Sequence, residues 1–125
     1  MKVLQWRELV CGAVLAVVLS GCGPSAEDLR NKGIAEYQIG RTEQARALLQ
    51  MSLDLDPVDP EALYYMGRAM HTDEFYEHAI FYYQACLHVS PGHSEVQEWL
   101  SKATTALAAR SRGPRTEPTK AAGPE

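Results

Sequence analysis

Cysteine and histidine are the residues of this 125-residue chain whose chemistry is most distinctive: it has three cysteines and four histidines. Cys22 stands at the end of the stretch LSGC, after two small residues, Ser20 and Gly21. A thiol in this place has three candidate roles: a structural side chain, half of a disulfide, or a point of attachment. As a thiolate it would be a nucleophile.

The segment before Cys22 narrows that choice. Lys2 and Arg7 give a positive start, and residues 9–19 (LVCGAVLAVVL) are uncharged and almost wholly apolar. A membrane-spanning helix needs roughly 20 apolar residues, whereas a secretory signal needs about 7 to 15 followed by small residues. Residues 1–21 are therefore predicted to be a removable export signal.

The stretch LSGC, Leu19 to Cys22, resembles the lipobox of bacterial lipoproteins, which is an aliphatic residue, two small residues and a cysteine. The resemblance implies that the thiol of Cys22 receives a diacylglycerol, that the signal is cut before it, and that the new amino terminus is acylated, for example with palmitate. An ordinary secretory signal followed by a chance cysteine is the alternative. Beyond this covalent lipid on Cys22, no cofactor is expected.

The same resemblance implies a location in the cell envelope. Gly23 follows Cys22 where enteric lipoproteins retained in the inner membrane carry aspartate. The periplasmic side of the outer membrane is therefore favoured, and the outer leaflet of the inner membrane is the alternative.

The cysteine count leaves no pair for an intramolecular disulfide in the mature chain. Cys11 would leave with the signal, Cys22 would be consumed by lipid, and Cys86 would remain as the one thiol. Stability must then come from packing. Cys86 lies on an apolar helical stripe, which predicts a buried thiol without a reactive role.

Composition excludes nucleic acid as a partner. Removing residues 1–21 leaves 104 residues with 10 basic and 15 acidic side chains, a net charge of −5, without a concentrated positive footprint for phosphate. Residues 111–125 contain three prolines, two glycines and no large apolar residue, so they are predicted to be a disordered tail.

The sequence in the middle of the chain repeats at a constant interval, which is the separation of positions 29 and 63. The two copies align without a gap. Pairs of identical residues at this repeat interval include Leu29 and Leu63, Gly33 and Gly67, Ala45 and Ala79, and Pro57 and Pro91. Within each copy the apolar spacing is helical, and it predicts two antiparallel helices per copy. The glycines and alanines would allow the helices to approach closely, and the prolines would end each pair.

The repeated stretch resembles the tetratricopeptide repeat (TPR). Pro60 to Pro91 matches the family at its aromatic, alanine, small and proline positions (Leu63, Gly67, Tyr76, Ala79, Tyr83, Cys86, Pro91), and residues 26–57 form a weaker copy. The resemblance implies an all-α, right-handed helical-hairpin solenoid. We expect repeat 1 at residues 26–57, after lipidated Cys22 and a tether at residues 22–25, and repeat 2 at 58–93.

Helix caps refine this expectation. Ser25 with Asp28, and Ser94 with Gln97, are spaced as capping boxes, and Asp59 precedes a first-turn proline, Pro60. Residues 94–110 are predicted to be a helix that caps the solenoid.

Three residues depart from the family pattern. Lys32 and Glu36 stand where the family has apolar residues, so the first helix should be less buried than the third. Glu74 replaces the turn glycine that Gly40 supplies in the first copy.

No enzyme chemistry is predicted. The four histidines do not form HExxH, and no helical i, i+4 pair with a carboxylate as third ligand is present, so no metal site is assigned. A histidine-metal enzyme is kept as the weakest alternative.

The TPR resemblance implies a concave groove lined by the first helices of successive pairs. Its groove positions map to Glu27, Arg30, Ile34, Tyr37 and Gln38 in copy one and to Glu61, Tyr64, Arg68, His71 and Thr72 in copy two. Tyrosine and arginine are enriched in interface hot spots, which favours Tyr37, Tyr64 and Arg68. The alternative is that Tyr37 and Tyr64 only pack against neighbouring helices.

The predicted function is a membrane-anchored adaptor or assembly factor of the cell envelope, with a protein or peptide in the groove and the membrane bound through lipid. A pilotin-like role occurs among relatives. An obligate structural subunit of an envelope complex is the alternative, and self-association is left open.

Overall fold

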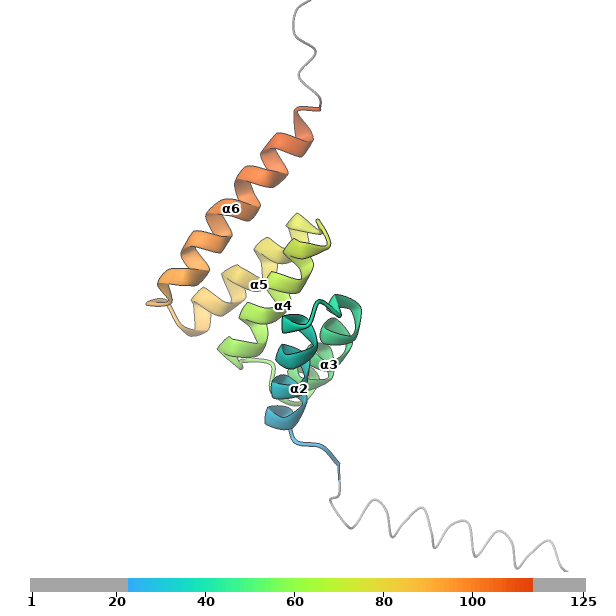
Figure 1. The fold of residues 1–125 in the computed structure, drawn as a ribbon. Helices are drawn as coiled ribbons and strands as arrows, with labels where there is room; N and C mark the ends of the chain where they lie inside the picture. The colour runs from blue at the N-terminus through green and yellow to red at the C-terminus, as the bar shows by residue number, and fades with distance from the viewer. Residues whose placement is uncertain (1–22, 114–125) are drawn as a thin grey trace, which may run out of the picture.

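The computed structural model of the chain describes residues 23–113, and these form five α-helices without a β-strand. The helices are α2 (Ala26–Gln38), α3 (Thr42–Leu55), α4 (Pro60–Thr72), α5 (Tyr76–Val89) and α6 (Ser94–Ser111). They follow one another as two hairpins and a single terminal helix (Figure 1). None of these five helices is long and apolar enough to cross a membrane.

The helix boundaries repeat at the same interval as the sequence. Both ends of α4 follow those of α2 at this interval, and both ends of α5 follow those of α3 in the same way. The predicted N-caps at Ser25 and Asp59 are confirmed, since both side chains accept hydrogen bonds from first-turn amides and Ser25 forms a capping box with Asp28. Each hairpin ends before its predicted proline, at Leu55 or Val89.

Close contact within each hairpin depends on glycine. A methyl group on Gly33 would lie 2.8 Å from the Leu49 side chain, and one on Gly67 would lie 2.5 Å from the Tyr83 ring. Ala45 and Ala79 are fully buried on the facing helices. The two glycines therefore let the helices of each pair pack more closely than any residue with a Cβ would allow at these positions, and the alanines keep the facing side small.

One hydrogen bond is repeated in both hairpins by different chemical groups. The Ser52 hydroxyl donates to the Ala26 carbonyl at 2.7 Å, and the Cys86 thiol, at the equivalent place in the second hairpin, donates to the Pro60 carbonyl at 3.2 Å. Burial raises the pKa of the Cys86 thiol, which keeps it protonated and able to donate. Cys86 is thus a buried packing residue, as its apolar stripe predicted.

The turn between the helices of each pair requires a left-handed backbone. Gly40 has φ of 84° in the first turn, and Glu74 has φ of 63° at the equivalent place in the second. Glycine adopts this conformation freely, whereas a side chain makes it costly. The second copy thus keeps the geometry of the turn despite losing its glycine.

Helix α4 is at the centre of the core. It buries six residues, against two in α2, so the expected difference between the first and third helices is confirmed. Met66 is 1% exposed, and full burial of such a side chain contributes about 1.5–3 kcal/mol. Helix α4 contacts all four other helices, because it lies between the first hairpin and α6.

Helix α6 begins at Ser94, the first residue of the predicted helix, but its N-cap and its last residue differ from the prediction. Its N-cap is His93, without a side-chain cap bond, and Ser94 is the first helical residue, so the predicted Ser94–Gln97 capping box is wrong. The Gln97 side chain instead donates to the Pro91 carbonyl at 3.3 Å. The helix ends at Ser111 rather than Arg110. It packs against α5 and α4 through buried Val96 and Ala103.

Some predictions fall outside the described residues. The export signal at residues 1–21, the lipid attachment at Cys22 and most of the tail, residues 114–125, are among them. The tether and the groove positions are described from Gly23 onward.

Candidate protein-interaction face

The first helices of the hairpins and α6 lie next to one another, because α4 contacts both α2 and α6. The side chains that meet between them come from one face of each helix, and we call this surface the inner face. It is made of Tyr37 from α2; Tyr64, Tyr65, Arg68, His71 and Thr72 from α4; and Trp99 and Lys102 from α6.

Arg68 is the centre of the inner face. Its guanidinium carbon lies 3.7 Å from the centre of the Trp99 ring, and 5.7 and 5.6 Å from the rings of Tyr37 and Tyr64. One of its nitrogens donates to the Tyr64 hydroxyl at 2.8 Å. Within residues 23–113 Arg68 forms no ion pair with a carboxylate. Other guanidinium donors thus remain for a partner.

Tyr64 is a packing residue. It is 6% exposed, and its hydroxyl accepts from Arg68 and donates to the Glu95 carboxylate at 3.2 Å. Burial raises the pKa of this hydroxyl, and the hydrogen bond from Arg68 opposes the rise. Of the two roles that the sequence left open, the structure therefore favours packing for Tyr64, with its ring forming the floor beneath Arg68.

Tyr37 is partly exposed and bridges two helices. Its hydroxyl lies 3.4 Å from the Thr72 hydroxyl, and its ring meets Tyr65 edge to face at 5.8 Å. The other groove positions of α2 differ from it, because Ile34 is partly buried against the core and Gln38 is exposed at the last turn. Tyr37 and Arg68 are thus the partly exposed hot-spot candidates that meet on this face.

His71 lies at the edge of the inner face. Its ring meets Tyr76 and Trp99 edge to face, both at 5.3 Å, and its Nδ1 atom is buried without a hydrogen-bond partner among the described residues. Burial lowers the pKa of His71, and the nearby charges of Arg68 and Lys102 lower it further. The ring is therefore held in its neutral form near neutral pH.

The remaining groove positions form an ion network at the start of α4. Arg30 lies 2.8 Å from Asp59, 3.3 Å from Glu61 and 3.7 Å from Glu27. One guanidinium thus pairs with three carboxylates, and these ion pairs connect α2 to the N-terminal end of α4.

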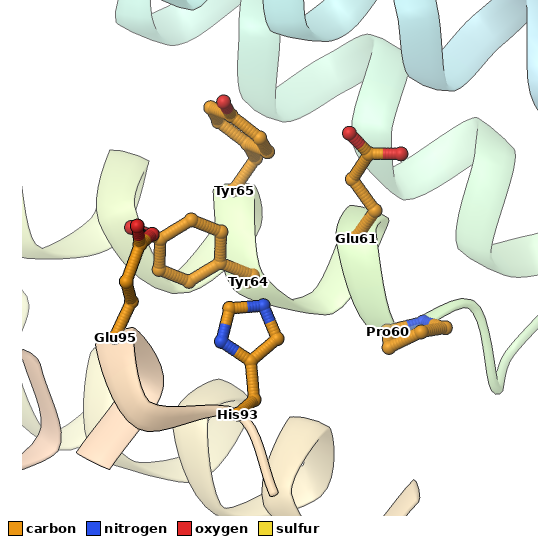
Figure 2. Close-up of a pocket in the computed structure, with 6 residues that line it drawn as sticks. All are labelled: Pro60, Glu61, Tyr64, Tyr65, His93 and Glu95. Carbon is orange, nitrogen blue, oxygen red and sulfur yellow. The ribbon is translucent and has the colours of Figure 1, made fainter. Parts of the chain in front are cut away.

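A depression of about 290 Å³ lies between α4 and the start of α6, and we call it the acidic pocket. Figure 2 shows the side chains that surround it, with the Tyr64 ring beside Glu95 and His93, and Glu61 at the first turn of α4. Its lining residues are Pro60, Glu61, Tyr64, Tyr65, His93 and Glu95.

Sequence reasoning did not assign Tyr65, Trp99, Lys102, His93 or Glu95 to this surface. The missed signal is the repeat itself: Trp99 follows Tyr65 at the repeat interval, and Lys102 follows Arg68 in the same way. Continuing the repeat into residues 94–110 would have placed both on the same face as their counterparts in α4.

Two other depressions lie away from the inner face. One, of about 220 Å³, is lined by Arg46, Met70, Phe75 and His78. The other, of about 380 Å³ and mostly apolar, lies where the described chain begins and is lined by Gly23, Pro24, Leu29, Met51, Asp54 and Leu55.

Metal-ligating residues do not gather in the described part of the chain. Between residues 23 and 113, no group of three or more histidine, cysteine or acidic side chains is placed to hold a metal ion.

No family model matches the chain, and no curated protein matches it. It is similar to solved structures of MamA, with a TM-score of 0.66 at 24% identity over 70% of this chain and 48% of that one, and a TM-score of 0.55 at 21% identity over 70% and 61%. The NMR structure of the first TPR domain of human RPAP3 aligns with a TM-score of 0.42 at 20% identity over 70% and 96%.

The chain thus spans about half the length of the first MamA structure it matches. At these identities the likeness concerns the fold. Together with the two repeated hairpins, it shows that the described residues form an all-α helical-hairpin solenoid.

Proposed function

We propose that this protein is a membrane-anchored adaptor or assembly factor that holds another protein on its inner face. The observation that carries the proposal is Arg68, a cation stacked on Trp99 with no carboxylate partner in residues 23–113. Arginine and aromatic residues in partly desolvated surroundings are the usual centres of protein interfaces. The solenoid fold supports this use, since stacked hairpins present an extended binding surface.

Membrane attachment through a lipid on Cys22 is the second part of the proposal. It is supported by the stretch LSGC after an apolar run of signal length. In its most specific form, the proposal places the protein on the periplasmic side of the outer membrane and gives it a pilotin-like role in assembling an envelope complex.

The partner is to be found by crosslinking in the native host, with a photoreactive residue at exposed Gln38. Arg68→Ala should then weaken capture of that partner by about thirtyfold, because truncating a hot spot costs about 2 kcal/mol. Arg112→Ala, the same change beyond the end of α6, is the control and should bind normally. Equal binding by both variants, with unchanged circular dichroism melts, would remove the inner face from the function.

Cys22→Ser tests the anchor. Each buried methylene contributes about 0.8 kcal/mol to membrane binding, and stable attachment takes more than one acyl chain. The variant should fold but leave the membrane fraction after a detergent-free wash. Unchanged sedimentation with membranes would refute the lipid anchor.

An obligate subunit of an envelope complex is the second candidate, favoured by exposed apolar side chains away from the inner face. Leu55 and Val58 are each 61% exposed, and Phe81 is 63% exposed. Mass measurement in neutral detergent separates the candidates, because a soluble monomer supports an adaptor and aggregation without a partner supports a subunit.

A further inference from the structure

We propose that the acidic pocket takes a positively charged side chain, arginine or lysine, from a partner protein. The inference rests on the proposed function, because it names the chemistry of the partner that the surface between α4 and α6 selects. It is carried by a cavity of about 290 Å³ whose walls combine aromatic rings with two carboxylates.

The charge of the pocket is negative. Within residues 23–113 Glu95 forms no ion pair, and its described contact is the hydrogen bond that it accepts from the neutral Tyr64 hydroxyl. Glu61 shares the single guanidinium of Arg30 with Glu27 and Asp59. A cation entering the pocket would supply the missing positive charge, whereas an anion would be repelled.

Arg68 does not neutralise the pocket by direct contact. Its guanidinium donates to the Tyr64 hydroxyl, which in turn donates to Glu95. The Tyr64 hydroxyl thus stands between Arg68 and Glu95, and no described ion pair joins the two charged groups.

The walls suit a cation because they present aromatic rings. The rings of Tyr64 and Tyr65 meet edge to face at 5.2 Å, and His93 lies 5.4 Å from Tyr64. A guanidinium or ammonium group is attracted to a ring face. A cavity of about 290 Å³ has room for the end of one long side chain.

The acidic wall continues beyond the pocket. Glu27, Glu61 and Glu95 follow one another at the repeat interval, each in the first turn of α2, α4 or α6. Acidic residues at these places also stabilise their helices through the helix dipole. A partner segment that runs along the N-terminal ends of α2, α4 and α6 would nevertheless meet one carboxylate at each helix. A segment with several basic residues therefore fits better than a single isolated cation.

The test uses the full-length chain as its host processes it, in non-ionic detergent and at neutral pH. The probes are two blocked tripeptides, acetyl-Gly-Arg-Gly-amide and its citrulline counterpart, which has nearly the same shape but no charge. Backbone amide NMR signals report where each probe binds. The arginine peptide should shift the signals of Tyr65, His93 and Glu95, and should bind roughly tenfold more tightly than the citrulline peptide.

Matched variants assign the effect to the pocket. Glu95→Gln and Glu61→Gln keep side-chain shape and one acceptor oxygen but remove the charge, and each should weaken arginine-peptide binding by roughly fivefold. Glu77→Gln, the same change on α5, should leave binding unaltered. Equal binding of the two peptides, shifts located elsewhere, or an equal loss in Glu77→Gln would overturn the proposal. If a pocket variant fails to fold, the comparison of arginine with citrulline on the unaltered chain decides.

Failure of this inference is distinguishable from failure of the proposed function. A host partner that is lost with Arg68→Ala but retained with Glu95→Gln and Glu61→Gln would refute the cationic contact and leave the adaptor intact. A partner that binds all three variants normally would instead remove the inner face from the function, whatever the arginine peptide does.

Discussion

Glu74 occupies a backbone conformation that its side chain disfavours. Its φ of 63° is close to that of Gly40 in the equivalent turn, and its carbonyl accepts a hydrogen bond from Arg110 of α6 at 2.9 Å. The turn is therefore held in place by the packing of α6 as well as by the hairpin. Glutamate seldom adopts the left-handed backbone conformation, and Glu74 adopts it because the repeated hairpin geometry requires this turn.

Glu74→Gly should therefore stabilise the chain. Removing the left-handed strain gains about 1–2 kcal/mol, and the greater freedom of glycine in the unfolded chain offsets about half of it. We expect a net gain of about 0.5–1 kcal/mol in urea denaturation, with the Arg110 contact intact. Gln84→Gly, at an exposed position in the middle of α5, is the control and should lose a similar amount. A destabilised Glu74→Gly would show that the Glu74 side chain contributes more than its strain costs.

His71 should make the stability of the chain depend on pH. Its pKa lies below the usual 6.5 through burial and the charges of Arg68 and Lys102. The unfolded chain then binds the proton more tightly, so the stability present above about pH 6.5 is lost as the pH falls toward the folded-state pKa. Burial raises the pKa of the neighbouring Tyr83 hydroxyl, so it stays neutral in this range, and the Trp99 ring does not ionise.

Thermal melts between about pH 7 and pH 5 check this prediction. The unaltered chain should lose melting temperature over this range, and His71→Gln should lose less. His88→Gln, at an exposed histidine of α5, should follow the unaltered chain. The same loss in all three proteins would assign the pH dependence to other groups.

At the scale of the helices, the two helices of each hairpin are in close contact, and this contact is made by different residues in the two hairpins. Both glycines face a fully buried side chain, but a methyl group on Gly67 would lie 2.5 and 2.6 Å from two atoms of the Tyr83 ring, whereas one on Gly33 would lie 2.8 and 3.1 Å from two atoms of the Leu49 side chain. The closer approach to a rigid ring makes the site at Gly67 the more crowded of the two.

Gly67→Ala should thus destabilise the chain by about 1–3 kcal/mol, because overpacking costs this much in a filled core. Gly33→Ala, the matched change in the first hairpin, should cost less. Urea denaturation of both variants measures the difference. Equal losses would mean that Tyr83 yields as easily as Leu49, and the second hairpin is then no more rigid than the first.

Helix boundaries could be predicted because the repeat interval and the caps agree on them. Gly33 and Gly67, Pro57 and Pro91, and the caps at Ser25 and Asp59 each encode a local requirement that a single sequence displays. The N-cap of α6 could not be predicted from residue types alone: Ser94 has the side chain of an N-cap, but it is the first helical residue, in register with the first residues of α2 and α4, and His93 takes the N-cap position.

The candidate site was harder to predict because it depends on contacts between helices. Arg68 was identified as a groove residue, but its stacking on Trp99 joins α4 to α6 and needs the docking of α6. Tyr64 carries the same sequence features as an exposed hot spot and is nevertheless buried by that helix. Sequence patterns identify which face of α4 is special, and tertiary packing decides which side chains remain accessible there.

At the scale of the whole molecule, the proposed anchor lies close along the chain to the start of the first described helix, α2. Gly23 and Pro24 alone separate Cys22 from the Ser25 cap, so a tether of extended residues is about 10 Å long. If Cys22 carries lipid, partners of the inner face must be membrane-proximal themselves.

Lengthening the tether should then weaken partner capture. A Gly/Ser linker of about 30 residues after Cys22 adds a reach of roughly 30 Å and dilutes the domain near the bilayer. The yield of the host crosslink at Gln38 should fall several-fold. The same linker after Gly113, at the other end of the described chain, is the control. Equal yields would show that distance from the membrane is unimportant.

The stacking of Arg68 on Trp99 has an optical consequence. The chain has two tryptophans, Trp6 and Trp99, and removal of residues 1–21 would leave Trp99 alone. Its ring lies 3.7 Å from the Arg68 guanidinium and 4.3 Å from the Lys102 nitrogen. Because indole emission responds to nearby charge, a ligand that draws either cation away would change the colour and intensity of the intrinsic fluorescence. The mature protein would carry its own label at the centre of the inner face.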